Sequence, residues 1–188
     1  FVPPSDAVAA SSDNESMFSQ DLSHIGYDIV YSVHGFATVP RGKIHAALRN
    51  FRASMRPGGL GFIAAATEQS HDARFAMMYH DERRKIFAAV NTRMNEEPPT
   101  LTSAEVICDA LSAQGVSYNV EVKSHVTLVS VLDGSAMLEA YLHGVAMDDT
   151  LSLDTMLQSS TLGSYLSSCL TPDGSAYAFP QRVAHVTI

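Results

Sequence analysis

Long apolar runs and grouped cysteines are both missing from this sequence of 188 residues. No stretch approaches the roughly eighteen consecutive apolar residues of a membrane-spanning helix, and no basic segment followed by an apolar one opens the chain. We therefore expect neither a membrane span nor a secretory signal. The two cysteines, Cys108 and Cys169, lie far apart and outside any metal-ligand spacing, which is typical of a reduced, cytoplasmic protein.

Positive charge is also scarce, with 12 Lys and Arg residues against 20 Asp and Glu and a net charge of −8. Proteins that bind DNA or RNA usually gather basic residues on one face to replace phosphate counterions. The only basic cluster, Arg83-Arg84-Lys85, directly follows Asp81 and Glu82, which favours a solvated helix face with charge pairs along the helix. We expect no nucleic-acid partner.

Two buried strands with an amphipathic helix between them are predicted in the region from Tyr27 to Ala66. The first strand is apolar and ends in a polar turn at His34-Gly35. Apolar residues then recur at helical spacing up to Met55, and Pro57-Gly58-Gly59 is expected to stop this helix. An apolar strand follows, ending at Ala66. A strand, a helix and a second buried strand in this order indicate a parallel sheet.

These residues resemble the middle of the class I S-adenosylmethionine-dependent methyltransferases. The resemblance rests on Tyr27-Asp28-Ile29-Val30 in the first strand and on Arg56-Pro57-Gly58-Gly59 before the second. In that family they belong to the fourth and fifth strands. The resemblance implies an α/β, Rossmann-like sheet of parallel strands flanked by helices. It also implies an antiparallel last strand between the fifth and sixth.

Further helices and strands are predicted after Ala66. Four segments have helical patterns and two have strand patterns: helices at 73–91, 102–114, 136–147 and 151–170, and strands at 116–132 and 177–188. The resemblance makes the 102–114 helix the fifth helix of the family and the 116–132 strand its sixth strand. The strand at 177–188 would be the last strand of the family sheet. We expect one domain over 1–188, with 67–98 and 134–172 as helical insertions or a lid.

The glycine-rich cofactor loop of the family is missing from the chain. Gly26 is the only glycine among the first thirty residues, and the chain starts with Phe1. We therefore expect the C-terminal part of a methyltransferase that lacks its first β-α-β segment. The Tyr27–Ser32 strand would then have an open apolar edge, which a preceding N-terminal segment or a second copy in a homodimer would cover.

The resemblance also implies which residues contact S-adenosylmethionine. Asp6 and Ala7 match the acidic and small residues that approach the adenine ring after the third strand. An alternative is a simple turn in which Asp6 caps the next helix. Ser32 and Val33 match positions that run past the methionine part of the cofactor. After transfer, the cofactor product would be S-adenosylhomocysteine.

The acceptor is expected at the carboxyl ends of the strands, where open α/β sheets bind ligands. His34 could orient an acceptor or serve as the catalytic base, or it could simply bond its own turn. Phe36 follows in the same turn. The polar residues 67–72 emerge at the same edge, and His71, Phe75 and Tyr79 would share one side of a lid helix. Aromatic residues at this spacing are equally typical of a core helix.

We predict methyl transfer to a small-molecule acceptor, by an enzyme of which this chain is the C-terminal part. Transfer from a sulfonium requires alignment and exclusion of water. No metal is expected, because Asp148-Asp149 has no third carboxylate at a suitable spacing. One alternative is a non-catalytic methyltransferase-like subunit that binds a protein partner through its open sheet edge. Another is a nicotinamide reductase, although Tyr79 is followed four residues later by Arg83 and not by lysine.

Overall fold

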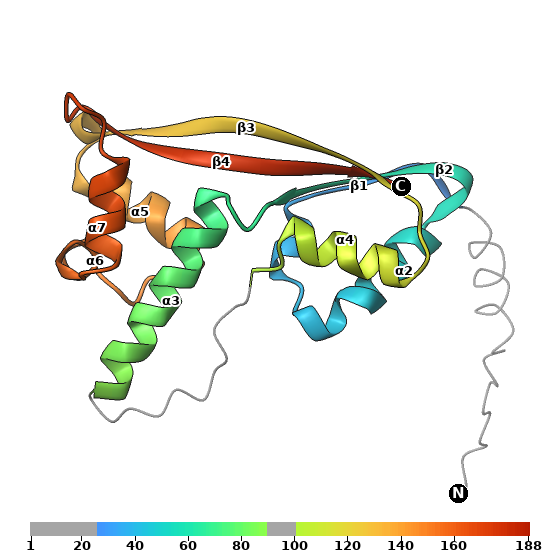
Figure 1. The fold of residues 1–188 in the computed structure, drawn as a ribbon, viewed down its shortest axis with the longest axis horizontal. Helices are drawn as coiled ribbons and strands as arrows, with labels where there is room; N and C mark the ends of the chain where they lie inside the picture. Colours follow the sequence, from blue (N-terminus) through green and yellow to red (C-terminus); the bar gives the residue numbers. More distant parts are fainter. Residues whose placement is uncertain (1–25, 90–100) are drawn as a thin grey trace, which may run out of the picture.

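A computed structural model describes residues 26–89 and 101–188, which form a four-stranded sheet with helices beside it (Figure 1). The strands are β1 (Tyr27–Val33), β2 (Met55–Ala66), β3 (Asn119–Ser130) and β4 (Ala176–Thr187). The helices are α2 (Ile44–Ala53), α3 (His71–Ala89), α4 (Ala104–Ala113), α5 (Ser135–Ala146), α6 (Leu153–Gln158) and α7 (Leu162–Cys169). Within these two ranges, no helix has both the length and the apolar character needed to cross a membrane.

The strands lie in the order β1-β2-β4-β3. β1 runs parallel to β2, while β4 is antiparallel to both β2 and β3. Val186 of β4, for example, lies between Ile63 of β2 and Val120 of β3. The expectation of an antiparallel last strand between its two neighbours is therefore confirmed.

Helices α2 and α4 cover one face of this sheet and lie together beneath it in Figure 1. Leu48 of α2 and Ile107 of α4 are fully buried against Ile63 and Val186 of the sheet. Apolar side chains at helical spacing therefore supply this core, because one stripe of each helix faces the strands.

The opposite face of β1 is exposed, so the prediction that this strand is buried was wrong. Ile29, Tyr31 and Val33 are 61%, 73% and 59% exposed. Val30 lies on the other face, where it lines a hollow beside α2. Side chains alternate along a strand, and the helices cover only one of its faces. β1 is also an edge strand of the described sheet, and its apolar outer face continues onto Leu60 of β2.

A second core joins α3 to α5, α6 and α7. α3, α5, α6 and α7 pack on one another near the far end of the β3–β4 hairpin (Figure 1). Phe75 of α3, Leu142 of α5 and Leu166 of α7 are fully buried there together with Phe179 of β4. These four helices thus form one helical body beside the long β3–β4 strand pair.

Two predicted helices have different ends in the structure. The first stops at Ala53, and Met55 and Pro57-Gly58-Gly59 belong to the segment that starts β2. The predicted helix at 151–170 is divided into α6 and α7, because Ser159 between them has an extended backbone. Its hydroxyl accepts a hydrogen bond from the Leu162 amide, at 3.2 Å, and so starts the second helix.

Candidate functional site

A cleft of about 440 Å³ opens beyond the carboxyl end of β1. Its walls come from the turn after that strand, the start of α3, residues 101–103 and one side of α5. A smaller hollow of about 170 Å³ adjoins it toward β3 and β4. The two cavities have four lining residues in common, namely His34, Asp72, Tyr141 and Val145.

His34 occupies a left-handed turn at the end of β1. Its backbone has φ 54° and ψ 2°, and its amide donates to the Ala64 carbonyl of β2 at 2.8 Å. A left-handed conformation is uncommon for a residue with a side chain, so the strand-end hydrogen bond fixes an unusual geometry. This geometry directs the chain sharply away from the sheet and leaves the imidazole exposed at the cleft.

A buried hydrogen-bond network forms the opposite wall. Ser70 Oγ donates to Gln181 Oε1 at 2.5 Å, and Gln181 Nε2 donates to Asp72 Oδ1 at 2.6 Å and to the Tyr141 hydroxyl at 3.3 Å. Gln181 is buried, so its amide cannot obtain these partners from water. The network therefore holds the Asp72 carboxylate and the Tyr141 hydroxyl in fixed positions on the cleft wall.

Tyr141 remains a neutral phenol at this wall. Burial, followed by the charge of Asp72, raises its pKa to about 12. Its hydroxyl therefore keeps its proton at neutral pH and is a hydrogen-bond donor as well as an acceptor. The cleft thus combines an imidazole on one side with a carboxylate and a phenol on the other.

Of the predicted cofactor residues, Ser32 and Val33 do not line this cleft. Asp6 and Ala7 lie outside the described residues. Ser32 points to the α2 side of the sheet and Val33 to the open face, because neighbouring residues of a strand point in opposite directions. Among the described residues, the cleft wall is formed by other side chains, including His34, Asp72 and Tyr141.

The predicted aromatic acceptor residues have core positions. Phe36 packs edge-on against Phe51 beneath the sheet, with ring centroids 5.6 Å apart. Phe75 and Tyr79 are fully buried in the second core. They do share one side of α3, and that side faces the sheet and the other helices. The core alone accounts for their helical spacing.

His71 is also fully buried, among four aromatic rings. Its Nδ1 lies 2.8 Å from the Tyr165 hydroxyl, and its ring centroid is 4.1 Å from that of Phe179. Burial, assisted by the charge of Arg74, lowers its pKa to about 4. His71 is therefore neutral at pH 7 and belongs to the support of the cleft, since the next residue is Asp72.

Sequence reasoning overlooked two residues of the site. Asp72 was already included among the polar residues 67–72, which we expected at the same edge as the acceptor. Tyr141 and Gln181 carried no signal, because each lies far along the chain from β1 and was placed on a helix or strand face by spacing alone. Asp148 forms an ion pair with Arg83 at 2.9 Å. Within residues 26–89 and 101–188, no three His, Cys, Asp or Glu side chains are grouped for a metal ion.

The order and directions of the strands decide the fold. In class I methyltransferases, the last strand is antiparallel and lies between the fifth and sixth, as β4 lies between β2 and β3. The order and directions of β2, β4 and β3 therefore agree with what the resemblance implies.

Comparisons with known proteins returned remote structural matches. No family model and no curated protein matches the sequence. A cyclopropane-fatty-acyl-phospholipid synthase-like protein from Lactobacillus casei is 13% identical, with a TM-score of 0.46 over 94% of this chain and 60% of its own. A SAM-dependent methyltransferase from Geobacter sulfurreducens, in complex with S-adenosyl-L-homocysteine, is 15% identical, with a TM-score of 0.32 over 89% of this chain and 61% of its own.

A third match, the YcgJ protein from Bacillus subtilis, is 11% identical, with a TM-score of 0.43 over 86% of this chain and 63% of its own. The chain thus spans about three fifths of the length of the solved structures that it matches. The fold assignment rests on the strand order and directions, and not on these scores.

Proposed function

We propose that this chain is the C-terminal part of an enzyme that transfers a methyl group from S-adenosylmethionine to a small-molecule acceptor. The observation that supports the proposal is the cleft at the carboxyl end of β1, in the sheet order of the class I methyltransferases. Ligands of open α/β sheets bind beyond this end of the strands. A cleft of about 440 Å³ is in the size range of small-molecule sites.

The chemistry requires little from the side chains. S-adenosylmethionine supplies the methyl group from its sulfonium, and the protein aligns donor and acceptor and excludes water. His34 would hold an acceptor hydroxyl or carboxylate, or take the proton of a hydroxyl, since its imidazole is exposed at the cleft. Asp72 and Tyr141, fixed by Gln181, would orient the acceptor from the other wall.

The cofactor side is assigned to residues that precede Tyr27. Asp6 and Ala7 are the proposed adenine contacts. Ser32 and Val33 would approach the cofactor only at the end of β1. An N-terminal segment that carries the first strands would also cover the apolar outer face of Ile29 and Tyr31.

Isothermal titration of S-adenosylhomocysteine tests this proposal. The ligand is titrated into the 188-residue chain and into the same protein extended at its N-terminus. We expect binding by the extended protein and weak or no binding by the shorter chain. Absence of binding by both forms would overturn the proposed function.

The exposed face of β1 favours a second candidate, a non-catalytic subunit that binds a protein partner through this face. An exposed apolar edge strand pairs readily with another chain. For the chain alone, we expect a mass in solution above the monomer value of 20.2 kDa. Tyr31→Lys should restore the monomer, while Leu132→Lys, at an exposed apolar residue away from this face, should not.

Light scattering after size-exclusion chromatography measures these masses. A folded wild-type monomer would show that the face needs no cover. Association through Tyr31 together with no binding of S-adenosylhomocysteine by the extended protein would favour the subunit over the enzyme.

A further inference from the structure

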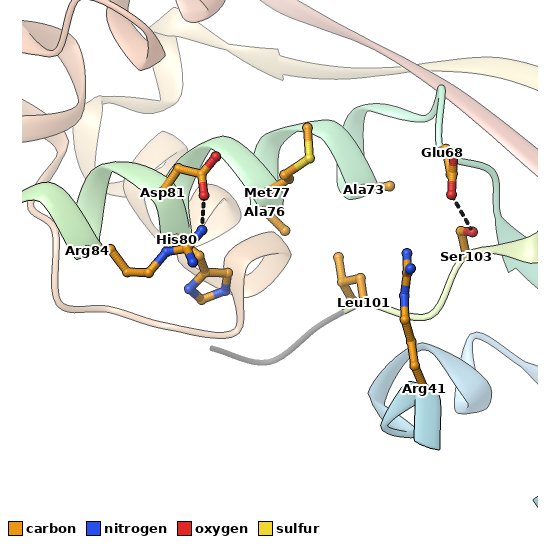
Figure 2. A pocket seen from close by; sticks show the side chains of 10 residues that line it. All are labelled: Arg41, Glu68, Ala73, Ala76, Met77, His80, Asp81, Arg84, Leu101 and Ser103. Atoms are coloured by element: carbon orange, nitrogen blue, oxygen red, sulfur yellow. Dashed lines mark hydrogen bonds and ion pairs between the residues drawn. The ribbon is translucent and has the colours of Figure 1, made fainter. Parts of the chain in front are cut away.

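A second hollow, of about 370 Å³, lies along another side of α3 (Figure 2). Ala73, Ala76 and Met77 of the helix form its apolar wall, and Leu101 faces them from the chain that leads into α4. Arg41, from the short helix at Arg41–Lys43, closes one end, and Arg84 lies at the other. The hollow is separate from the cleft, although Ala73, Leu101 and Ser103 contribute to both.

His80 is a buried polar residue of this wall. Its side chain is on the Leu101 side of α3 in Figure 2, and the residue is only 4% exposed. Its Nε2 lies 3.1 Å from the Ala146 carbonyl oxygen. A carbonyl only accepts, so Nε2 carries the proton and donates it.

The other ring nitrogen is therefore a hydrogen-bond acceptor. Burial lowers the pKa of His80, so the imidazole is neutral at pH 7 and Nδ1 has a free lone pair. Among the described residues, Nδ1 is buried and has no hydrogen-bond partner. Leaving a buried acceptor unpaired is unfavourable, so such a group on a cavity wall indicates a donor on the occupant.

His71 provides the contrast. Its Nε2 is also buried without a partner among the described residues, but the aromatic core surrounds this ring and none of the described cavities reaches it. Only at His80 does the unpaired nitrogen coincide with a hollow lined by apolar side chains.

The charges around the hollow balance. Arg84 is paired with Asp81 one turn away, and at the other end Arg41 lies near Glu68, which accepts a hydrogen bond from Ser103 Oγ at 3.4 Å. Two cations and two anions thus surround an apolar wall. This arrangement favours a neutral occupant, because an ion would lose its hydration without gaining a net opposite charge.

We propose that this hollow is a binding site for a neutral, mainly apolar molecule with a hydroxyl or amide N–H that donates to His80 Nδ1. Ala73, Ala76, Met77 and Leu101 would contact its apolar part. The site needs neither S-adenosylmethionine nor the methyl-transfer reaction, so it stands or fails separately from the proposed function.

Calorimetric titration with two probes of matched size tests the donor. 1-Octanol and heptyl methyl ether have the same number of heavy atoms, but only the alcohol donates a hydrogen bond. We expect the alcohol to bind the 188-residue chain about tenfold more tightly, the effect of one neutral hydrogen bond. Equal affinities, or no binding of the alcohol, would overturn the proposal.

Substitution of His80 locates the effect. His80→Gln keeps an amide donor for the Ala146 carbonyl but lacks an acceptor at the position of Nδ1. We expect the affinity for 1-octanol to fall to that for the ether, which itself stays unchanged. An unchanged preference for the alcohol in this variant would contradict the role of Nδ1.

A surface variant tests the site even if His80→Gln fails to fold. Met77 is an exposed residue of the apolar wall, and Met77→Glu should abolish binding of both probes by placing a charge there. Met137→Glu, at an exposed methionine of α5 outside the hollow, should leave both affinities unchanged. Unaltered binding by Met77→Glu would place the probes elsewhere on the protein and overturn the proposal.

Discussion

The side-chain amide of Gln181 donates a 2.6 Å hydrogen bond to Asp72 Oδ1, which links the closing strand β4 to the first turn of α3. The same amide group accepts from Ser70 Oγ at 2.5 Å. Gln181 lies 109 residues after Asp72 and 111 residues after Ser70 in the chain. One buried side chain thus fixes the wall of the cleft on which Asp72 and Tyr141 lie.

Replacing Gln181 with leucine should destabilise the protein by about 2 kcal/mol, because the hydroxyl of Ser70 and the carboxylate of Asp72 lose their buried partner. Urea unfolding followed by circular dichroism measures the difference. Gln158→Leu, at an exposed position of α6, serves as the control and should change stability by less than about 0.5 kcal/mol. Equal effects of the two substitutions would show that the network contributes no stability.

Burial of His71 should make the protein less stable in mild acid. The pKa is lowered from 6.5 to about 4, so below pH 6.5 the unfolded chain binds a proton that the folded chain does not. The stabilising effect of the neutral imidazole is complete above pH 6.5 and is lost as pH falls toward 4. The loss is on the order of 3 kcal/mol, at about 1.4 kcal/mol for each pH unit.

His71→Phe isolates this effect, because phenylalanine keeps an aromatic ring against Phe179 and does not titrate. The free energy of unfolding of the wild type, minus that of the variant, should decrease across this pH range. Comparison of the two proteins cancels the contributions of other groups, including His80. A difference that stays constant with pH would show that His71 is not buried as a neutral ring.

The ion pair between Arg83 and Asp148 should contribute measurably to stability, unlike the other pairs on α3. Its two charged groups are 2.9 Å apart, and their side chains are 14% and 10% exposed. Arg83→Met leaves Asp148 without its cation and should cost about 2 kcal/mol. Arg84→Met breaks an exposed pair with Asp81 and should cost less than about 0.5 kcal/mol. Chemical unfolding of both variants would show whether the ranking holds.

His34→Asn should separate the imidazole from the unusual backbone at this position. Asparagine adopts the left-handed conformation readily, so the turn and the fold should be retained. In the N-terminally extended protein, we expect methyl transfer to slow about a hundredfold, the lower range for loss of a general base. Release of S-adenosylhomocysteine with a panel of small hydroxy and carboxylic acids measures the rate.

His45→Asn provides the matched control for this rate, because His45 lies on α2 away from the cleft. It should leave methyl transfer unchanged. Activity of His34→Asn equal to that of the wild type would exclude the imidazole from the reaction and leave His34 as a turn residue.

The sequence determined the elements and their class because these depend on local chemistry. Helical spacing of apolar residues placed α2, α3, α4 and α5 to within a few positions, and the resemblance predicted an antiparallel last strand between its neighbours. The sequence pattern also placed His34 at the end of β1, since the apolar strand is followed there by a polar turn. The positions of the helices and of His34 need only the period of the pattern and the order of the segments, whereas the place of the last strand came from the resemblance.

Only the tertiary structure decided which sides of these elements meet. Spacing put His71, Phe75 and Tyr79 on one side of α3, but it could not tell an acceptor pocket from a core formed with Phe179, more than ninety residues later. Nor could spacing show that one face of β1 stays exposed. A strand of mostly apolar residues has the same sequence pattern whether other elements cover one of its faces or both. Gln181 contacts Asp72 because β4 packs against the start of α3. No sequence pattern near either residue predicts this contact.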